Sequence, residues 1–183
     1  MSPHRITRRH WLAASPLAAA VLAAQQHAHQ AGRSPQPPPL SILDAAEARE
    51  IEAIAAQIIP ADDTPGAREA GVIYFIDRAL ATFDQDKRAL YAEGLKDLQA
   101  RRAALFPGSQ SIAALHPAQQ IRLVQAMEKT DFFELLRTHT ALGFFGNPSY
   151  GGNRDQIGWK LIGFEDRFQF QPPFGYYDAE PKG

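Results

Sequence analysis

The 183-residue sequence predicts an all-α fold: about five helices in a compact bundle, followed by an irregular C-terminal segment rich in Gly and aromatic residues. Apolar residues recur at helical spacing through most of the body, and Pro or Gly residues interrupt the pattern between segments. No stretch alternates apolar and polar positions with β-branched residues, as a half-buried strand would. With 45% apolar and 21% charged residues, the chain has the composition of one globular domain.

Residues 1–31 have the pattern of an export signal and are set apart from the fold. A basic stretch ending in Arg8 and Arg9 precedes an apolar run over residues 11–24, which is shorter than the roughly 20 residues that a membrane-spanning helix needs. The paired arginines resemble a twin-arginine (Tat) signal peptide, a route that carries folded cargo. A general secretory signal is the alternative, and both predict a location outside the cytoplasm. Residues 32–39 are expected to be a Pro-rich linker.

The body is expected to begin near residue 40 with a helix that Ser41–Asp44 caps and Pro60 stops. Its apolar positions follow helical spacing: Ile51, Ile54, Ala55 and Ile58. Residues 60–66 are expected to form a loop because of their Pro, Asp and Gly content. A second helix follows, with six apolar positions on one face: Val72, Phe75, Ile76, Ala79, Leu80 and Phe83.

Three further helices are expected before residue 147. The third covers about residues 86–105 and ends at Pro107-Gly108. Pro117 suits the first turn of the fourth, and Thr130 caps the fifth, which ends around residues 143–146. Each has expected inward positions: Tyr91, Leu95, Leu98 and Leu105 in the third; Ile121, Val124 and Met127 in the fourth; Phe132, Leu135, Leu136, His139 and Leu142 in the fifth.

The composition changes after residue 140, where eight of the 13 glycines lie. That much Gly, with added Pro, excludes long regular elements, and the tail over residues 166–183 is expected to be extended and aromatic. Residues 150–153 predict a tight turn with positive φ, in which Asn153 caps a short helix toward Trp159. Aromatic side chains outside a local core cover either their own domain or another protein.

Few residues of the body carry recognisable chemistry. The chain has no cysteine, which excludes disulfides, cysteine-ligated metal and covalently attached haem. A net charge of −1 gives no indication of nucleic-acid binding. His139 is either a haem or metal ligand or a core histidine with both ring nitrogens satisfied, and His116 fits a helix cap or an exposed loop.

Three acidic residues form a second candidate group: Asp62, Asp63 and Asp77. Such carboxylates can bind a divalent ion or perform acid/base chemistry, or they can supply turn contacts and the N-cap of the next helix. Residues 150–153 lack the preceding strand and the Gly spacing of a nucleotide-binding loop, and no G-x-S-x-G elbow is present. These observations favour an interaction role over an enzymatic one.

Two groups of motifs resemble the gluconate 2-dehydrogenase subunit 3 family. The first comprises Ile58-Ile59-Pro60-Ala61-Asp62, Pro65-Gly66-Ala67-Arg68-Glu69-Ala70-Gly71-Val72 and Phe75-Ile76-Asp77. The second comprises Leu136-Arg137-Thr138-His139-Thr140, Gly143-Phe144-Phe145-Gly146-Asn147-Pro148, Tyr150-Gly151-Gly152-Asn153 and Gly158-Trp159. The resemblance extends over about residues 40–165, and the Tat-like leader is also similar to that of the family.

The resemblance implies a non-catalytic small subunit of a periplasmic dehydrogenase complex. The expected partners are a FAD-dependent large subunit of the glucose–methanol–choline type, a c-type cytochrome that carries haem, and the Tat translocase. It further implies that the flavoprotein is exported folded on this chain's signal, that the complex associates with the inner membrane, and that this chain holds no cofactor or catalytic residue. The alternatives are a stand-alone periplasmic oxidoreductase or a helical binding module, with a non-covalent cofactor near His139.

The segment over residues 144–177 is the expected partner interface, because permanent subunit interfaces are large and rich in aromatic residues. Six residues in it are the candidate contacts: Tyr150, Gly151, Gly152, Asn153, Trp159 and Phe164. The alternative for Tyr150 and Trp159 is a place in the local core, since both residue types are often mostly buried in monomers.

Overall fold

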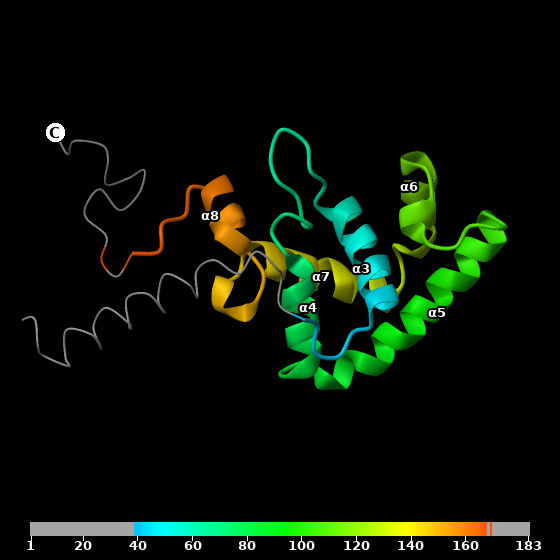
Figure 1. The fold of residues 1–183 in the computed structure, drawn as a ribbon, viewed down its shortest axis with the longest axis horizontal. Coiled ribbons are helices and arrows are strands. Elements are labelled where there is room, and N and C mark those ends of the chain that lie inside the picture. Colours follow the sequence, from blue (N-terminus) through cyan, green and yellow to red (C-terminus); the bar gives the residue numbers. More distant parts are fainter. Residues whose placement is uncertain (1–38, 168, 170–183) are drawn as a thin grey trace, which may run out of the picture. The chain divides into compact units, whose positions relative to one another are not determined.

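The computed structural model describes residues 39–167 and 169, and every α-helix and short 3-10 helix in this part belongs to one compact unit that begins at Leu40. The α-helices, drawn in Figure 1, are α3 (Ala45–Ile58), α4 (Val72–Ala81), α5 (Arg88–Leu105), α6 (Pro117–Met127), α7 (Asp131–Phe145) and α8 (Ile157–Leu161). The 3-10 helices are η1 (Gln85–Lys87), η2 (Ile112–Ala114), η3 (Pro148–Tyr150) and η4 (Arg154–Gln156). The described residues contain no strand, which confirms the all-α prediction. The expected leader and most of the linker and tail lie outside them.

Helix α3 begins three residues later than the Ser41 start expected from the sequence. Asp44 is the N-cap, and its carboxylate accepts hydrogen bonds from the backbone N–H groups of Ala46 and Glu47 at 2.7 and 2.8 Å. The Glu47 side chain in turn accepts from the Asp44 N–H, which completes a capping box. Ser41 lies three residues before this cap, and its backbone N–H donates to the Asp77 carboxylate.

Helices α4 and α7 form the most extensive helix pair of the unit, and α3 packs on both. The core side chains at this contact are fully or almost fully buried: Ile51 and Ile54 of α3, Phe75, Ile76 and Leu80 of α4, and Leu136 and Phe144 of α7. Helix α5 approaches α7 at Gly94, where an added Cβ would lie 2.0 Å from the Phe132 ring. The inward positions Tyr91, Leu95 and Leu98 are confirmed as buried.

Three expected core residues are instead exposed: Phe83 by 54%, Ile121 by 48% and Leu142 by 49%. Phe83 lies beyond α4, which ends at Ala81, so the helical spacing no longer decides where it points. In α6 the buried row is Leu123, Val124 and Met127, which turns Ile121 away from the core. In α7 the buried row runs through His139 and Gly143, and Leu142 is rotated by about 100° from Gly143.

The chain after α7 has short helical turns and no long element, as its Gly and Pro content predicts. Helix α8 has five residues and packs on the C-terminal part of α7. Figure 1 shows α8 and α6 at opposite ends of the unit. None of the helices in the described part of the chain combines the length and the apolar character that a membrane span requires.

Candidate functional site

His139 lies in a buried hydrogen-bond chain that joins three elements. The Tyr91 hydroxyl is 2.9 Å from Nδ1, and the Asp84 carboxylate is 3.2 Å from Nε2. Because a carboxylate accepts, we assign the ring proton to Nε2, and Tyr91 then donates to Nδ1. Burial lowers the pKa of His139, and this outweighs the opposite effect of Asp84, so the folded state favours the neutral ring. Burial also raises the pKa of Tyr91 above its ordinary value.

Both ring nitrogens of His139 are therefore hydrogen-bonded. Of the two alternatives that the sequence left open, a haem or metal ligand and a satisfied core histidine, the structure agrees with the core histidine. Its ring stacks on Tyr91 at 5.8 Å between centroids and meets Phe75 edge-on at 6.1 Å. Within residues 39–167, no group of three or more His, Asp and Glu side chains is close enough to hold a metal ion. The packing gives this histidine a structural role in joining α5, α7 and the turn after α4.

The three acidic candidates do not form one site. The Asp62 carboxylate accepts hydrogen bonds from the backbone N–H and the hydroxyl of Thr64 at 2.8 and 2.9 Å, which closes a turn and lowers the pKa of Asp62. The turn contact was expected, but the expected N-cap role is wrong, since Gly71 occupies the N-cap of α4. Asp63 is exposed beside this turn.

Asp77 has a different function, because its carboxylate fixes the start of the folded body. It accepts hydrogen bonds from three consecutive backbone N–H groups: Ser41 at 2.7 Å, and Ile42 and Leu43 at 3.0 Å each. Burial alone would raise the pKa of Asp77, but these donors outweigh it and hold the pKa below its ordinary value. The side chain is only 3% exposed. Asp77 thus ties residues 41–43 to α4.

Two hollows lie between α3 and α5. The smaller, of about 250 Å³, is lined by Ile42, Leu43, Glu47, Leu80, Arg88, Tyr91, Ala92 and Leu95. The larger, of about 380 Å³, is lined mainly by polar side chains from α3 and α5, with Gln110 at its edge. Their volumes lie below or near the lower limit of roughly 300 Å³ for small-molecule sites.

The turn over residues 150–156 is held in an unusual backbone conformation. Gly151 has φ of 105°, and three non-Gly residues also have positive φ: Asn153 at 47°, Asp155 at 55° and Gln156 at 59°. Such residues cost on the order of 1–3 kcal/mol each unless the surroundings fix them. The fully buried Asn153 side chain supplies this support, donating to the Gly146 carbonyl and accepting from the Gly158 N–H at 2.8 Å each.

Glycines in this region let the backbone lie directly on the end of α7. An added Cβ on Gly152 would lie 2.1 Å from the Gly143 carbonyl oxygen, and one on Gly158 would lie 2.0 Å from that of Phe144. The Trp159 indole N–H donates to the Phe145 carbonyl at 2.7 Å. The aromatic segment therefore builds a small core of its own against α7.

The six interface candidates separate into two groups by burial. Gly152, Asn153 and Trp159 belong to the local core, with Trp159 only 8% exposed, and Gly151 is half-buried. Tyr150 and Phe164 are exposed by 50% and 47% and can meet another molecule directly. For Trp159, the structure agrees with the alternative of a local core aromatic. A partner contact at Tyr150 and Phe164 stays a prediction.

Three other exposed apolar residues, Phe145, Leu161 and Ile162, also lie in the expected interface segment over residues 144–177, whereas Phe83 and Leu142 were expected in the core. We call the exposed apolar residues on these contacting elements the apolar end: Phe83, Leu142, Phe145, Tyr150, Leu161, Ile162 and Phe164. Phe83 meets Tyr150 edge-on at 6.1 Å, and Phe164 meets Trp159 at 4.9 Å. Phe83 and Leu142 both fall on the helical period of buried residues, so the sequence carried no signal that they are exposed. Large exposed apolar side chains gathered on contacting elements are typical of an interaction site.

Comparison with known proteins gives one match. Residues 45–166 match the model of a protein family described as gluconate 2-dehydrogenase subunit 3. The match covers all six described α-helices and ends beyond Phe164, so it includes the apolar end. No curated protein and no solved structure matches the chain.

Proposed function

The chain belongs to the gluconate 2-dehydrogenase subunit 3 family, and we propose that it is the non-catalytic small subunit of a periplasmic, FAD-dependent gluconate or sugar dehydrogenase. The name of the family describes a subunit of a multi-subunit gluconate dehydrogenase complex. In the proposal, this subunit is needed for assembly and for Tat-dependent export of a flavoprotein large subunit. FAD belongs to that partner, and haem c belongs to a cytochrome subunit.

The apolar end is the observation that carries the proposal. Seven large apolar side chains are 38–60% exposed there, contributed by α7, α8, η3 and the chain segments after α4 and α8. Fully burying an exposed side chain of this size contributes about 1.5–3 kcal/mol, so covering the exposed part of each of these half-buried side chains adds roughly half of that. Permanent subunit interfaces bury apolar and aromatic groups of this kind over about 2,000 Å² or more. A tightly bound partner supplies the missing cover.

The buried polar groups of the body support a role in assembly. His139 and Asp77, the two most chemically suggestive candidates, hold the fold together through hydrogen bonds to neighbouring elements. The Asn153 side chain does the same for α8. Each of these residues supports the fold, and in the proposal the oxidation of the substrate takes place in the FAD-containing large subunit.

The export part of the proposal concerns residues 1–31, which lie outside the described residues. Arg8 and Arg9 form the twin-arginine pair, and a Tat route fits a partner that must bind FAD before it crosses the membrane. One signal can serve two chains only if they bind tightly beforehand. The mature complex is then periplasmic and associates with the inner membrane through its other subunits.

Replacing Arg8 and Arg9 with Lys tests the shared export. Both this chain and the large subunit are expected to accumulate in the cytoplasm, because the translocase no longer recognises the signal. Fractionation followed by detection of each chain measures the outcome, and a Lys replacement of Arg5 is the matched control. A large subunit that still reaches the periplasm in the double variant contradicts shared export.

A further inference from the structure

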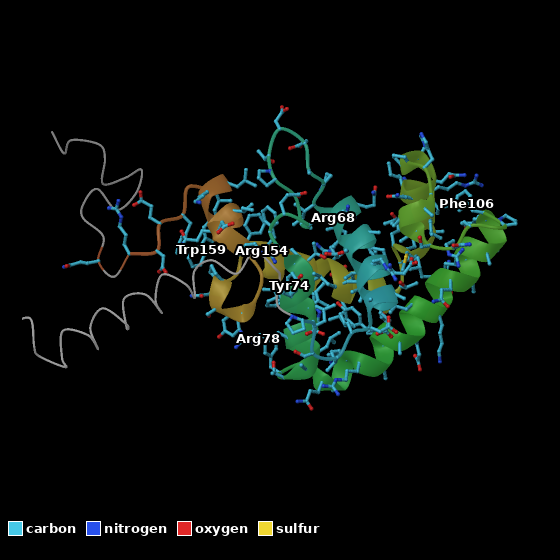
Figure 2. All side chains as sticks on the ribbon, in the orientation of Figure 1. Arg68, Tyr74, Arg78, Phe106, Arg154 and Trp159 are labelled. Atoms are coloured by element: carbon cyan, nitrogen blue, oxygen red, sulfur yellow. The ribbon has the colours of Figure 1, made fainter. Side chains whose placement is uncertain are left out.

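A row of alternating arginine and aromatic side chains runs beside the apolar end. The Arg154 guanidinium lies over the Tyr74 ring, with Cζ 5.1 Å from its centroid. One helical turn along α4, Arg78 Nη1 donates to the Ser149 carbonyl at 2.6 Å. Ser149 precedes Tyr150, whose ring meets Phe83. Figure 2 shows Tyr74 and Arg78 along α4, with Arg154 beside Tyr74.

These two arginines have no carboxylate partner among the described residues. The ion pairs of that part involve Lys87, Arg101, Arg137, His139 and Arg167. Two acidic residues lie near these arginines in the sequence. Asp155 directly follows Arg154, and Asp84, six residues after Arg78, bonds to His139. Both guanidinium groups are on exposed residues. Arg78 and Arg154 thus present two guanidinium groups that form no ion pair with the described residues, next to aromatic rings.

Both arginines are also held in place before any partner arrives. A carbonyl fixes Arg78, and the Tyr74 ring supports Arg154, whose backbone N–H donates to the Ala70 carbonyl at 2.9 Å. The residues on either side of Arg154, Asn153 and Asp155, both have positive φ. An ordered guanidinium loses little side-chain freedom when it forms a paired hydrogen bond with a carboxylate, which favours recognition of acidic groups.

We propose that Arg78 and Arg154, with the rings of Tyr74, Phe83 and Tyr150, form the part of the interface that recognises acidic side chains of the dehydrogenase large subunit. The occupant is an apolar surface on that subunit flanked by at least two carboxylates, each facing one guanidinium. The inference rests on the proposed function and adds the location and chemistry of the contact. The charged row selects the partner, and the apolar end supplies most of the buried area.

Charge reversal tests this assignment in the complete complex. The double variant Arg78→Glu with Arg154→Glu is expected to lower the affinity for the large subunit at least tenfold, because two attractive pairs become repulsive. Arg122→Glu with Arg49→Glu is the matched control: it makes the same charge change on exposed residues of α6 and α3 and should leave the affinity unchanged. Affinity is measured with tagged full-length chain co-expressed with the large subunit, at two salt concentrations.

A milder variant, Arg78→Gln with Arg154→Gln, removes the two positive charges without adding negative ones. It should therefore weaken binding of the large subunit by a smaller factor than the Glu double variant does. Its salt dependence should also be weaker than that of the unaltered chain. Thermal unfolding of each isolated variant checks that the fold is intact. If the Gln and Glu variants both retain the large subunit normally, the inference is overturned.

The remaining outcomes distinguish other occupants. If charge reversal destabilises the isolated chain and leaves retention unchanged, the row contacts another part of the same chain and the inference is wrong. If it splits a dimer of the isolated chain, the occupant is a second copy, which also overturns it. Retention that depends on Tyr150 and Phe164 but not on Arg78 and Arg154 refutes this inference and leaves the proposed function standing. Failure of the unaltered chain to bind any flavoprotein refutes the proposed function itself.

Discussion

Replacement of Asp77 with Ala should release the start of the folded body. The carboxylate is the acceptor for three consecutive N–H groups at 2.7–3.0 Å, and it aligns a segment whose Leu40 and Leu43 side chains pack against the core. A hydrogen bond to a charged group contributes about 1.5–3 kcal/mol. Ser41 and Ile42 are exposed, so water can replace part of the loss. We therefore expect a total of about 3 kcal/mol for Ala and about half of that for Asn.

Urea unfolding of the full-length chain measures this loss. With a slope of about 2 kcal/mol per molar urea for a domain of this size, the Ala variant should shift the midpoint down by about 1.5 M. Asp62→Asn is the matched control, because the Asp62 bonds to Thr64 close an exposed local turn. Limited proteolysis should cut the Ala variant first between residues 40 and 44. Equal midpoints for the Asp77 and Asp62 variants would refute the anchoring role.

The pH dependence has a defined sign. Because the folded state holds the pKa of Asp77 below its ordinary value, the unfolded chain takes up a proton first as the pH falls. The stabilisation is complete above the unfolded pKa of about 3.9 and is lost as the pH falls through the folded value. The Asn variant should show a smaller loss of stability below about pH 4 than the unaltered chain. An identical acid profile for both would exclude a contribution from this charge.

Three further perturbations test the packing. Gly94→Ala should lower the free energy of unfolding by about 1–3 kcal/mol, seen as a lower urea midpoint, because the new methyl group meets the Phe132 ring. This loss should outweigh the better helix propensity of Ala. A higher midpoint would contradict the close contact. The melting temperature should fall as the pH is lowered from about 6.5, since the folded state lowers the pKa of His139 and the unfolded chain takes up the proton first. His139→Gln should make the melting temperature depend less on pH. An unchanged dependence would contradict this role of His139. Asn153→Ala should cost about 2–4 kcal/mol in urea unfolding, because it removes both bonds of a buried side chain at positive φ; a loss below about 1 kcal/mol would show that other contacts hold α8.

Helical spacing predicted the elements and much of the core. The period of Phe75, Ile76 and Leu80 placed one face of α4 in the core, and the structure confirms it. The same rule failed at Ile121 and Leu142, because apolar residues occur on more than one face of α6 and α7. Periodicity cannot choose between such faces, since the choice depends on which neighbouring helix packs there.

The polar contacts were harder to predict than the helices. Asp77 bonds to residues 34–36 positions earlier in the chain, and His139 bonds to side chains of two other elements. No local spacing encodes these pairs, because they depend on the tertiary arrangement of the elements. The sequence did predict the turn at Asn153 and a bond from its side chain to the short helix that follows, but not the second bond, back to the Gly146 carbonyl.

Co-purification of the dehydrogenase large subunit with this chain tests the proposed role most directly. A tagged, full-length chain co-expressed with the flavoprotein should yield one complex with bound FAD, visible as flavin absorbance in the same size-exclusion peak. Replacing Tyr150 and Phe164 with Ala should remove the flavin from that peak while the small subunit stays folded. Elution of the unaltered chain alone, without flavin and without the large subunit, would contradict the proposed function.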